Sequence, residues 1–354
     1  MKKWFDSHVL WLSMLIGVLG YKLFLPLAPI LPWLIFFMLF FTFCKVNPLD
    51  LRLHKWHALV LATQLFLSFA IYILVLRLTS NTILAQGLLM CFIMPTATAA
   101  PIIAGKLGGS IQNLTTFTLL SNFATAIIVP ATFPLINNNL DLSTLEQIST
   151  LNSQLSTFFW PAFLRILSRI APLLLGPFFS AWLLRLAFNK YYRDHGITGS
   201  QDHEIREFVL PVKLAVLPFY LWVASIIVLS AVVTETVLSS FDLYLSTILT
   251  LLISSFFACL AQFGLGKLIG YHFPAASKGT DYQDILINPA AAPKTMAGVS
   301  SITAGQAFGQ KNTSLGVWMA NTYLDPMASL GAAAYIVWQN IFNSVQLFVA
   351  AHKK

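Results

Sequence analysis

A lysine stands near the middle of an apolar stretch that is long enough to cross a membrane. Lys311 is the only charged residue within 302–323. Placing a charged lysine at the centre of a bilayer costs at least about 2.5–3.5 kcal/mol, so such a residue needs a function or a compensating partner. The alternative is that its long side chain carries the charge to the membrane surface.

Two apolar stretches contain residues that interrupt helices. The segment Pro95–Pro101 lies inside 83–107, and the segment Gly305–Asn312 lies inside 302–323. Proline removes a backbone donor, and freed backbone groups in a bilayer survive only where protein or a water-filled cavity covers them. A matched pair of interruptions predicts a substrate site. The alternative is that both helices are simply kinked.

Neutral polar residues gather around the same interruptions. Their amides and hydroxyls could bind a substrate or a small cation, although a serine or threonine can also bond to its own helix. Beside Lys311, the candidate site residues are Gln64, Pro95, Thr96, Thr98, Pro101, Thr118, Gly309, Gln310, Asn312 and Thr313.

Motifs for catalysis or metal binding are missing from the sequence. There is no phosphate-binding Walker loop and no nucleophile paired with a base, so we expect no enzyme activity and no cofactor. The three cysteines form no CxxC pair, and His54 and His57 lack further ligands nearby in the sequence. We therefore predict no metal site built from these residue types.

The composition indicates a polytopic membrane protein. Of 354 residues, 57% are apolar and 10% are charged, against about 25% charged in soluble domains. The net charge of +8 could suggest nucleic acid, but the basic residues form no stripe, and cytoplasmic loops explain them. The expected partners are a small organic anion and the lipid bilayer, with a monomer as the plausible state and no nucleic acid.

Ten membrane spans are predicted, and Lys and Arg gather at the ends that would face the cytoplasm if the N-terminus lies there. This places both termini in the cytoplasm, with a bacterial inner membrane as the simplest location. The predicted spans are 8–25, 30–46, 57–79, 83–107, 111–136, 157–188, 209–233, 243–270, 302–323 and 327–350.

The spans divide into two sets of five. Because five is odd, the second set must enter the membrane from the opposite side, which predicts an inverted repeat. We expect 1–188 to hold the first repeat plus the sixth helix, 189–207 to form a charged cytoplasmic linker, and 208–354 to hold the remainder of the second repeat. Polar residues concentrate in spans three to five and eight to ten, so spans one, two, six and seven could form a separate scaffold.

The C-terminal region resembles the bile acid:sodium symporter family. The resemblance rests on Gly309–Gly316, Asp325-Pro326 and Tyr335–Asn340, and more loosely on Pro95–Gly109. It implies an all-α membrane protein of ten helices in two inverted repeats. A panel domain would comprise helices one, two, six and seven, and a core domain helices three to five and eight to ten. Helices four and nine would be unwound where they cross, and an organic anion would bind there and move by alternating access.

The family's sodium ligands carry over only in part. Gln64 matches a family glutamine, whereas Ala100 and Pro101 stand for a Ser-Asn pair, Ala307 for a glutamate and Lys311 for a glutamine. Hard cations prefer six or more oxygen ligands, so sodium binding is doubtful. The positions equivalent to the family's cation site are Gln64, Ala100, Thr118, Ala307, Gln310 and Lys311.

These replacements lead to one hypothesis about coupling. The ammonium of Lys311 would occupy the place of a sodium ion, held by Gln64 and by carbonyls of the broken helices. Transport of a bile-acid-like anion or another carboxylate or sulfonate would then be sodium-independent, either as uniport or coupled to a proton. The alternatives are a sodium-coupled symporter of the same fold and a membrane sensor that binds a ligand without moving it.

Overall fold

The computed structural model describes residues 2–44, 46, 51–137, 155–194, 216–275 and 295–352. All of its elements are helices, as the composition predicts. Within these described ranges, the one strand-like pairing is an isolated bridge between Thr96 and Lys311. Segments 138–154, 195–215 and 276–294, and with them most of the predicted linker over 189–207, lie outside the described residues.

Several long apolar helices identify the chain as an integral membrane protein. In the described part of the chain, six helices are long and apolar enough to cross a membrane. The count of ten spans and the inverted repeat stay predictions, because 8–25, 83–107, 302–323 and 327–350 are not among these six. The six are Tyr21–Phe43, Lys55–Thr79, Ile111–Ile136, Thr157–Phe188, Leu217–Ser239 and Leu245–His272.

One expected boundary is wrong. The predicted spans 8–25 and 30–46 leave a gap that holds Pro26 and Pro29, but the chain stays helical through both prolines as the 3-10 helix η1 (Leu25–Ile30), and Tyr21–Phe43 is one candidate span. Pro26 lies in the first turn of η1, where its fixed φ suits a helical start and its missing N–H is tolerated, and Pro29 removes one hydrogen bond from this short helix.

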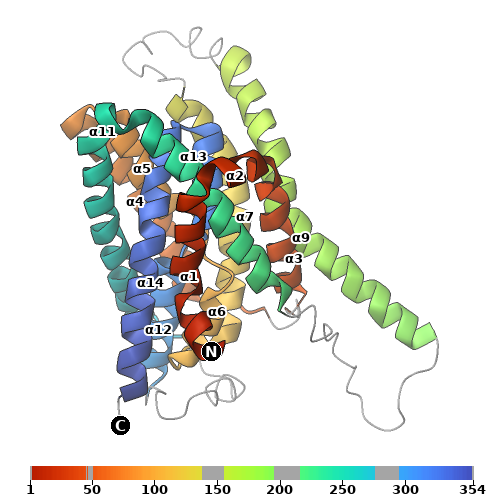
Figure 1. The fold of residues 1–354 in the computed structure, drawn as a ribbon. Helices are drawn as coiled ribbons and strands as arrows, with labels where there is room; N and C mark the ends of the chain where they lie inside the picture. Colours follow the sequence, from red (N-terminus) through yellow and green to blue (C-terminus); the bar gives the residue numbers. More distant parts are fainter. Residues whose placement is uncertain are drawn as a thin grey trace. The chain divides into compact units, whose positions relative to one another are not determined.

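The chain forms two compact units, and each is described by itself. The first comprises Met1–Asp50 and Leu167–Ala231. Its aromatic contacts include Phe43 and Phe178, whose rings lie 6.0 Å apart, and Gly17 leaves room for the backbone of Ile227. Its elements are α1 (Lys2–Leu19), α2 (Tyr21–Phe24), η1, α3 (Leu31–Phe43), the larger part of α9 (Trp160–Asp194) and the beginning of α11 (Leu217–His272) (Figure 1).

The second unit comprises Leu51–Ile166 and Val232–Lys354 and contains both interrupted helices. Close packing depends on glycine at one crossing, where a Cβ on Gly331 of α14 would overlap the backbone of Gly87 in α5. Its elements are α4 (Lys55–Thr79), α5 (Thr82–Ile93), α6 (Ala100–Lys106), α7 (Ile111–Asn137), η4 (Leu155–Phe159), the start of α9, the larger part of α11, α12 (Met296–Gly309), α13 (Thr313–Tyr323), η6 (Pro326–Ala328) and α14 (Ser329–His352).

Candidate functional site

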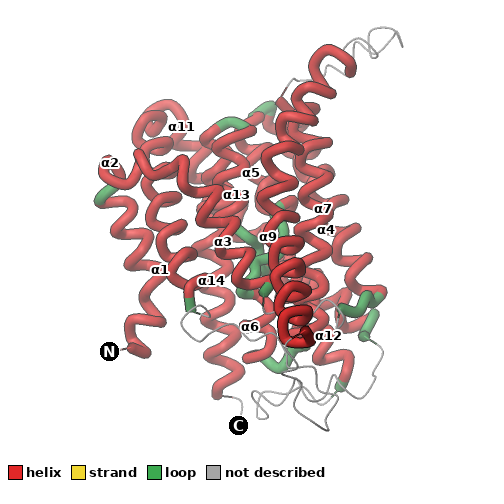
Figure 2. Tube along the Cα trace, turned by 90° about the vertical axis from the view of Figure 1, so that its right-hand side faces the viewer, coloured by secondary structure: helices red, strands yellow, loops and turns green. Residues whose placement is uncertain are grey.

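The two interruptions meet inside the second unit. Thr96 and Lys311 form an antiparallel bridge, so the short loops drawn in green within the helices lie against each other (Figure 2). The Ala97 amide donates to the Gln310 carbonyl at 3.0 Å, and the Asn312 amide donates to the Pro95 carbonyl at 2.7 Å. Each break therefore satisfies one freed N–H and one freed C=O of the other, as a low-dielectric interior requires.

The sequence explains where each break begins and ends. In the first, α5 ends at Ile93, and Pro95 cannot donate a backbone hydrogen bond to continue it. Pro101 then sits in the first turn of α6, where a missing N–H is tolerated.

The second break is shorter than predicted. The helix α12 continues through Gly305 to Gly309, so only Gln310, Lys311 and Asn312 are unwound. Glycine lowers helix stability without forbidding the helix, and a Cβ on Gly305 would overlap the side chain of Lys267. A Cβ on Gly309 would likewise overlap the Phe263 ring. These glycines therefore allow α11 to pack against α12, and they do not mark the edge of the break.

Thr96 and Lys311 each reach the last turn of the helix that ends beside the other. The Thr96 hydroxyl donates to the Ala307 carbonyl of α12 at 2.7 Å, and the Lys311 ammonium donates to the Phe92 carbonyl of α5 at 3.1 Å. Their backbone amides are also bound by side chains. The Thr96 amide donates to Ser121 at 2.8 Å, and the Lys311 amide donates to Gln339 at 2.9 Å.

The contacts of the two breaks follow a constant numerical offset. Thr96 and Lys311 are 215 positions apart (311 − 96), and so are the residues that accept their side chains, Phe92 and Ala307 (307 − 92). The same offset relates Ala97 to Asn312 (312 − 97) and Pro95 to Gln310 (310 − 95). Each of these four hydrogen bonds between the two segments thus has a counterpart in which the segments are exchanged.

The ammonium of Lys311 lies at the negative end of a helix. Lys311 is 1% exposed, and its ammonium lies 5.0 Å from the centre of the Phe308 ring. The last carbonyls of α5 carry partial negative charge and lack partners within their helix. The bond to Phe92 therefore gives the buried cation a favourable partner, and the cation–π contact adds to it.

Two glutamines complete the cap on α5. Gln64 of α4 donates to the Met94 carbonyl at 3.0 Å, and Gln262 of α11 donates to the Cys91 carbonyl at 3.1 Å. The expectation that Gln64 holds the ammonium is wrong, because no hydrogen bond joins Gln64 to Lys311 within the described residues. Gln64 and Lys311 both donate to the carbonyls at the end of α5, Gln64 to Met94 and Lys311 to Phe92, and so lie beside each other there. The side-chain oxygens of Gln64 and Gln262 remain without a partner there.

The N-terminus of α13 offers donors beside the bridge. The Asn312 side-chain oxygen accepts from the Leu315 amide at 3.2 Å, which caps this helix. Its side-chain nitrogen is buried and has no partner in the described part of the chain. Thr313 follows as the first residue of α13 and is also buried. An oxygen atom of a ligand would satisfy the free nitrogen.

The remaining predicted residues have different surroundings. Thr98 is half-buried in the turn before α6, whereas Ala100 and Pro101 are buried at its start. Gly309 ends α12, and its carbonyl accepts from the Tyr335 hydroxyl at 2.9 Å. Thr118 bonds to Leu114 of its own helix at 2.9 Å, so its hydroxyl is not directed to the bridge.

Gln310 belongs to a cluster of amides that the sequence did not predict. Its side-chain nitrogen donates to Gln306 and to Asn343 at 3.3 Å, and Gln306 donates to Gln346 at 3.0 Å. We call these four residues the amide seam. Asn343 and Gln346 were missed, as was Gln262, although Gln339, Asn343 and Gln346 recur at a helical spacing that could have revealed a polar face on α14.

Among the described residues, no three His, Cys, Asp or Glu side chains form a group that could hold a metal ion. Comparison with protein-family models and with curated proteins found no match for this chain. The resemblance to the bile acid:sodium symporter family therefore stays a prediction, and we infer the function from the geometry of the crossing.

Proposed function

We propose that this protein is a secondary transporter of an organic anion and that the Lys311 amine stands in the place of a sodium ion. The observation that carries the proposal is the buried ammonium at the meeting point of two interrupted helices. Ionisable residues within membrane proteins are costly and are commonly found at transport sites. Broken helices near mid-membrane are a common way to build such sites.

An anion is the ligand class that this environment favours. The Lys311 ammonium raises the local potential, and the free side-chain nitrogen of Asn312 stands at the positive end of α13. Thr98, in the half-buried turn before α6, could donate a further hydrogen bond. A carboxylate or sulfonate with a sizeable apolar part, such as a bile-acid-like molecule, fits donors set among apolar helices.

Independence from sodium follows from the side chains at the cation-site positions. Ala100 and Ala307 have no side-chain oxygen, and Lys311 brings a positive charge to the same region. Two unit charges 4 Å apart repel by about 4 kcal/mol at an effective dielectric constant of 20. The free oxygens of Gln64 and Gln262 alone are too few for a cation that prefers about six ligands. A proton remains a candidate for coupling because the Lys311 amine is a group that can bind and release one.

The proposal includes ten spans in two inverted five-helix repeats, with both termini in the cytoplasm. The two side-chain contacts, of Thr96 with Ala307 and of Lys311 with Phe92, share the offset of 215 positions and support the repeat, because equivalent residues of two copies make equivalent bonds. We assign the panel to helices one, two, six and seven and the core to the other six, in a bacterial inner membrane. The residue ranges of the two compact units support this assignment.

Uptake by proteoliposomes tests the proposal. We expect organic anions to accumulate or exchange in the protein's presence, with equal rates in sodium and in potassium buffers. Counterflow distinguishes transport from binding by a sensor, because a sensor exchanges no ligand across the membrane. If the wild type and the Lys311→Gln variant both show sodium-stimulated uptake, then the protein is a sodium-coupled symporter and the role given to Lys311 is wrong.

A further inference from the structure

The amide seam connects the crossing to the end of the molecule where α14 finishes. Gln310 lies in the second break, Gln306 is one turn earlier on α12, and Asn343 and Gln346 follow on α14. Both α12 and the C-terminal half of α14 extend toward the C-terminal end of the chain (Figure 1). The seam therefore runs along these two helices from the crossing outward.

The seam is most exposed at Gln346, its outermost residue on α14. Gln346 is partly exposed, whereas Asn343 is 5%, Gln310 is 3% and Gln306 is 1% exposed. Asn343 lies nine residues before His352 (352 − 343), which corresponds to about 13 Å along the helix axis. A polar contact of this depth between two helices needs an explanation beyond the fraying of a helix end.

The amide seam contains more side-chain N–H donors than the described residues provide with acceptors. The side-chain nitrogen of Gln310 donates to both Gln306 and Asn343. Asn343 and Gln346 act there as acceptors, and their own side-chain nitrogens have no acceptor within the described residues. These nitrogens are not fully covered by protein atoms, because none is among the fully buried atoms without a partner. Donors in this position require an oxygen ligand from outside the chain.

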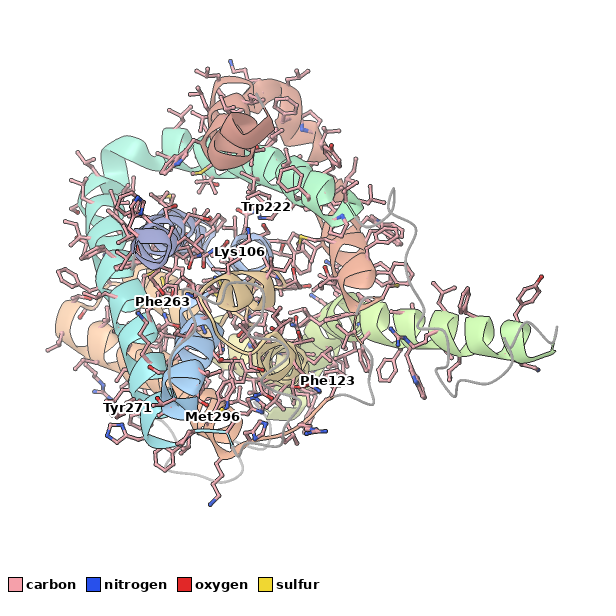
Figure 3. The ribbon with its side chains drawn as sticks, turned by 90° about the horizontal axis from the view of Figure 1, so that it is seen from below. Lys106, Phe123, Trp222, Phe263, Tyr271 and Met296 are labelled. Atoms are coloured by element: carbon pink, nitrogen blue, oxygen red, sulfur yellow. The ribbon has the colours of Figure 1, made fainter. Side chains whose placement is uncertain are left out.

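The helices around the amide seam pack differently on its two sides. The backbones of α12 and α14 make few close approaches, whereas α13 packs along α14, so long amides bridge the space between α12 and α14. Phe263 of α11 covers Gly309 and lies 5.8 Å from the Phe342 ring, which makes one flank apolar. Phe263 is on the side of α11 that faces these helices (Figure 3).

We propose that the amide seam holds a file of water molecules that opens the crossing to the solution at the C-terminal end of α14. Buried water typically makes about three hydrogen bonds to groups that lack protein partners, and the free N–H groups of Asn343 and Gln346 supply them in sequence. The inference rests on the proposed placement of the crossing within a membrane. It assigns an aqueous route to the α12–α14 side of the second unit, which the residue types alone did not indicate.

Cysteine accessibility in membrane vesicles tests the water file. The variants are Gln346→Cys and Asn343→Cys, each treated from either side with a charged, membrane-impermeant thiol reagent. Matched controls are Val345→Cys and Ser344→Cys, which lie at the same depth on exposed faces of α14. The native cysteines Cys44, Cys91 and Cys259 are all buried, so the wild type gives the background.

We expect both seam variants to react at least about tenfold faster than their controls, and from one side only, because a thiol reacts as a hydrated thiolate. Adding Gln346→Phe to Asn343→Cys should slow its labelling about tenfold by closing the route. Equal rates at seam and control positions, or no effect of the phenylalanine, would overturn the inference. Labelling requires no transport, so a failed uptake assay with fast seam labelling would reject the proposed function alone.

Discussion

Thr96 and Lys311 pair through their backbones while each side chain caps the helix that ends beside the other residue. One cap is a neutral hydroxyl and the other is a cation, so the crossing is symmetric in its bonds and asymmetric in its charge. Only the α5 end receives the ammonium. The electrostatic character of the site therefore depends on a single side chain, whereas its shape depends on both segments.

Replacing Thr96 with valine should destabilise the crossing. The valine keeps the branched shape and removes the donor to Ala307, which leaves a buried carbonyl without its partner. We expect the free energy of unfolding to fall by about 1–2 kcal/mol, measured by denaturation in mixed micelles. Thr322→Val is the control, because Thr322 is exposed and bonds only to Trp318 of its own helix. Equal effects of the two changes would contradict the cap.

Lys311→Met should separate stability from transport. The change leaves the Phe92 carbonyl without a partner, at a cost of about 1–3 kcal/mol, but removes a buried charge whose placement costs at least about 2.5–3.5 kcal/mol. We therefore expect the free energy of unfolding to stay equal or to rise, while anion uptake is lost. If Lys311→Met unfolds more easily than Thr96→Val, then the ammonium chiefly stabilises the structure.

Asn312→Ser tests the free donor at the start of α13. Serine caps helices about as well as asparagine, so stability should change little, but the side-chain nitrogen is gone. If that nitrogen binds an anionic substrate, then the apparent KM for uptake should rise about ten- to a hundredfold, as expected for a hydrogen bond to a charged group. Asn81→Ser makes the same change at the cap of α5 and should leave KM unaltered. An unchanged KM in both variants would remove Asn312 from the binding site.

Gly331→Ala should be severely destabilising. A Cβ at this position would overlap the backbone of Gly87, which cannot move without displacing α5. We expect a loss of about 3 kcal/mol or more, or little folded protein, because overpacking against backbone cannot relax by a change of rotamer. Gly264→Ala is the control, since nothing lies within 4 Å of its added Cβ, and its better helix propensity should stabilise the helix by up to about 1 kcal/mol. Comparable melting temperatures for the two variants would contradict the close crossing of α5 and α14.

Residue types and spacing predicted much of the crossing. Pro95 and Pro101 located the first break because proline constrains the backbone in any surroundings. The cost of burying Lys311 predicted a partner for its charge, and the Phe92 carbonyl is one. The extent of the second break was less predictable. Gly305 suggested an interruption, yet it serves helix packing, because whether a glycine unwinds a helix depends on the neighbour that approaches it.

The partners of the site residues could not be predicted from the local sequence. Gln64 was expected to bind the ammonium but donates to Met94 instead, because its amide N–H needs an acceptor and the unsatisfied carbonyls at the end of α5 supply one. Gln262 and the amide seam depend on which faces of α11, α12 and α14 meet. A pattern along one helix specifies a polar face, but the partner of that face is set by contacts between distant segments.

The crossing is tied largely by main-chain groups, and those groups are present whatever side chains the segments carry. The bonds of Ala97 to Gln310 and of Asn312 to Pro95 would survive most substitutions at these positions. Substitutions could therefore change the side chains at this point, such as a metal-binding carboxylate to an amine, without changing the backbone structure that holds them. The same framework can therefore present different side chains at this point.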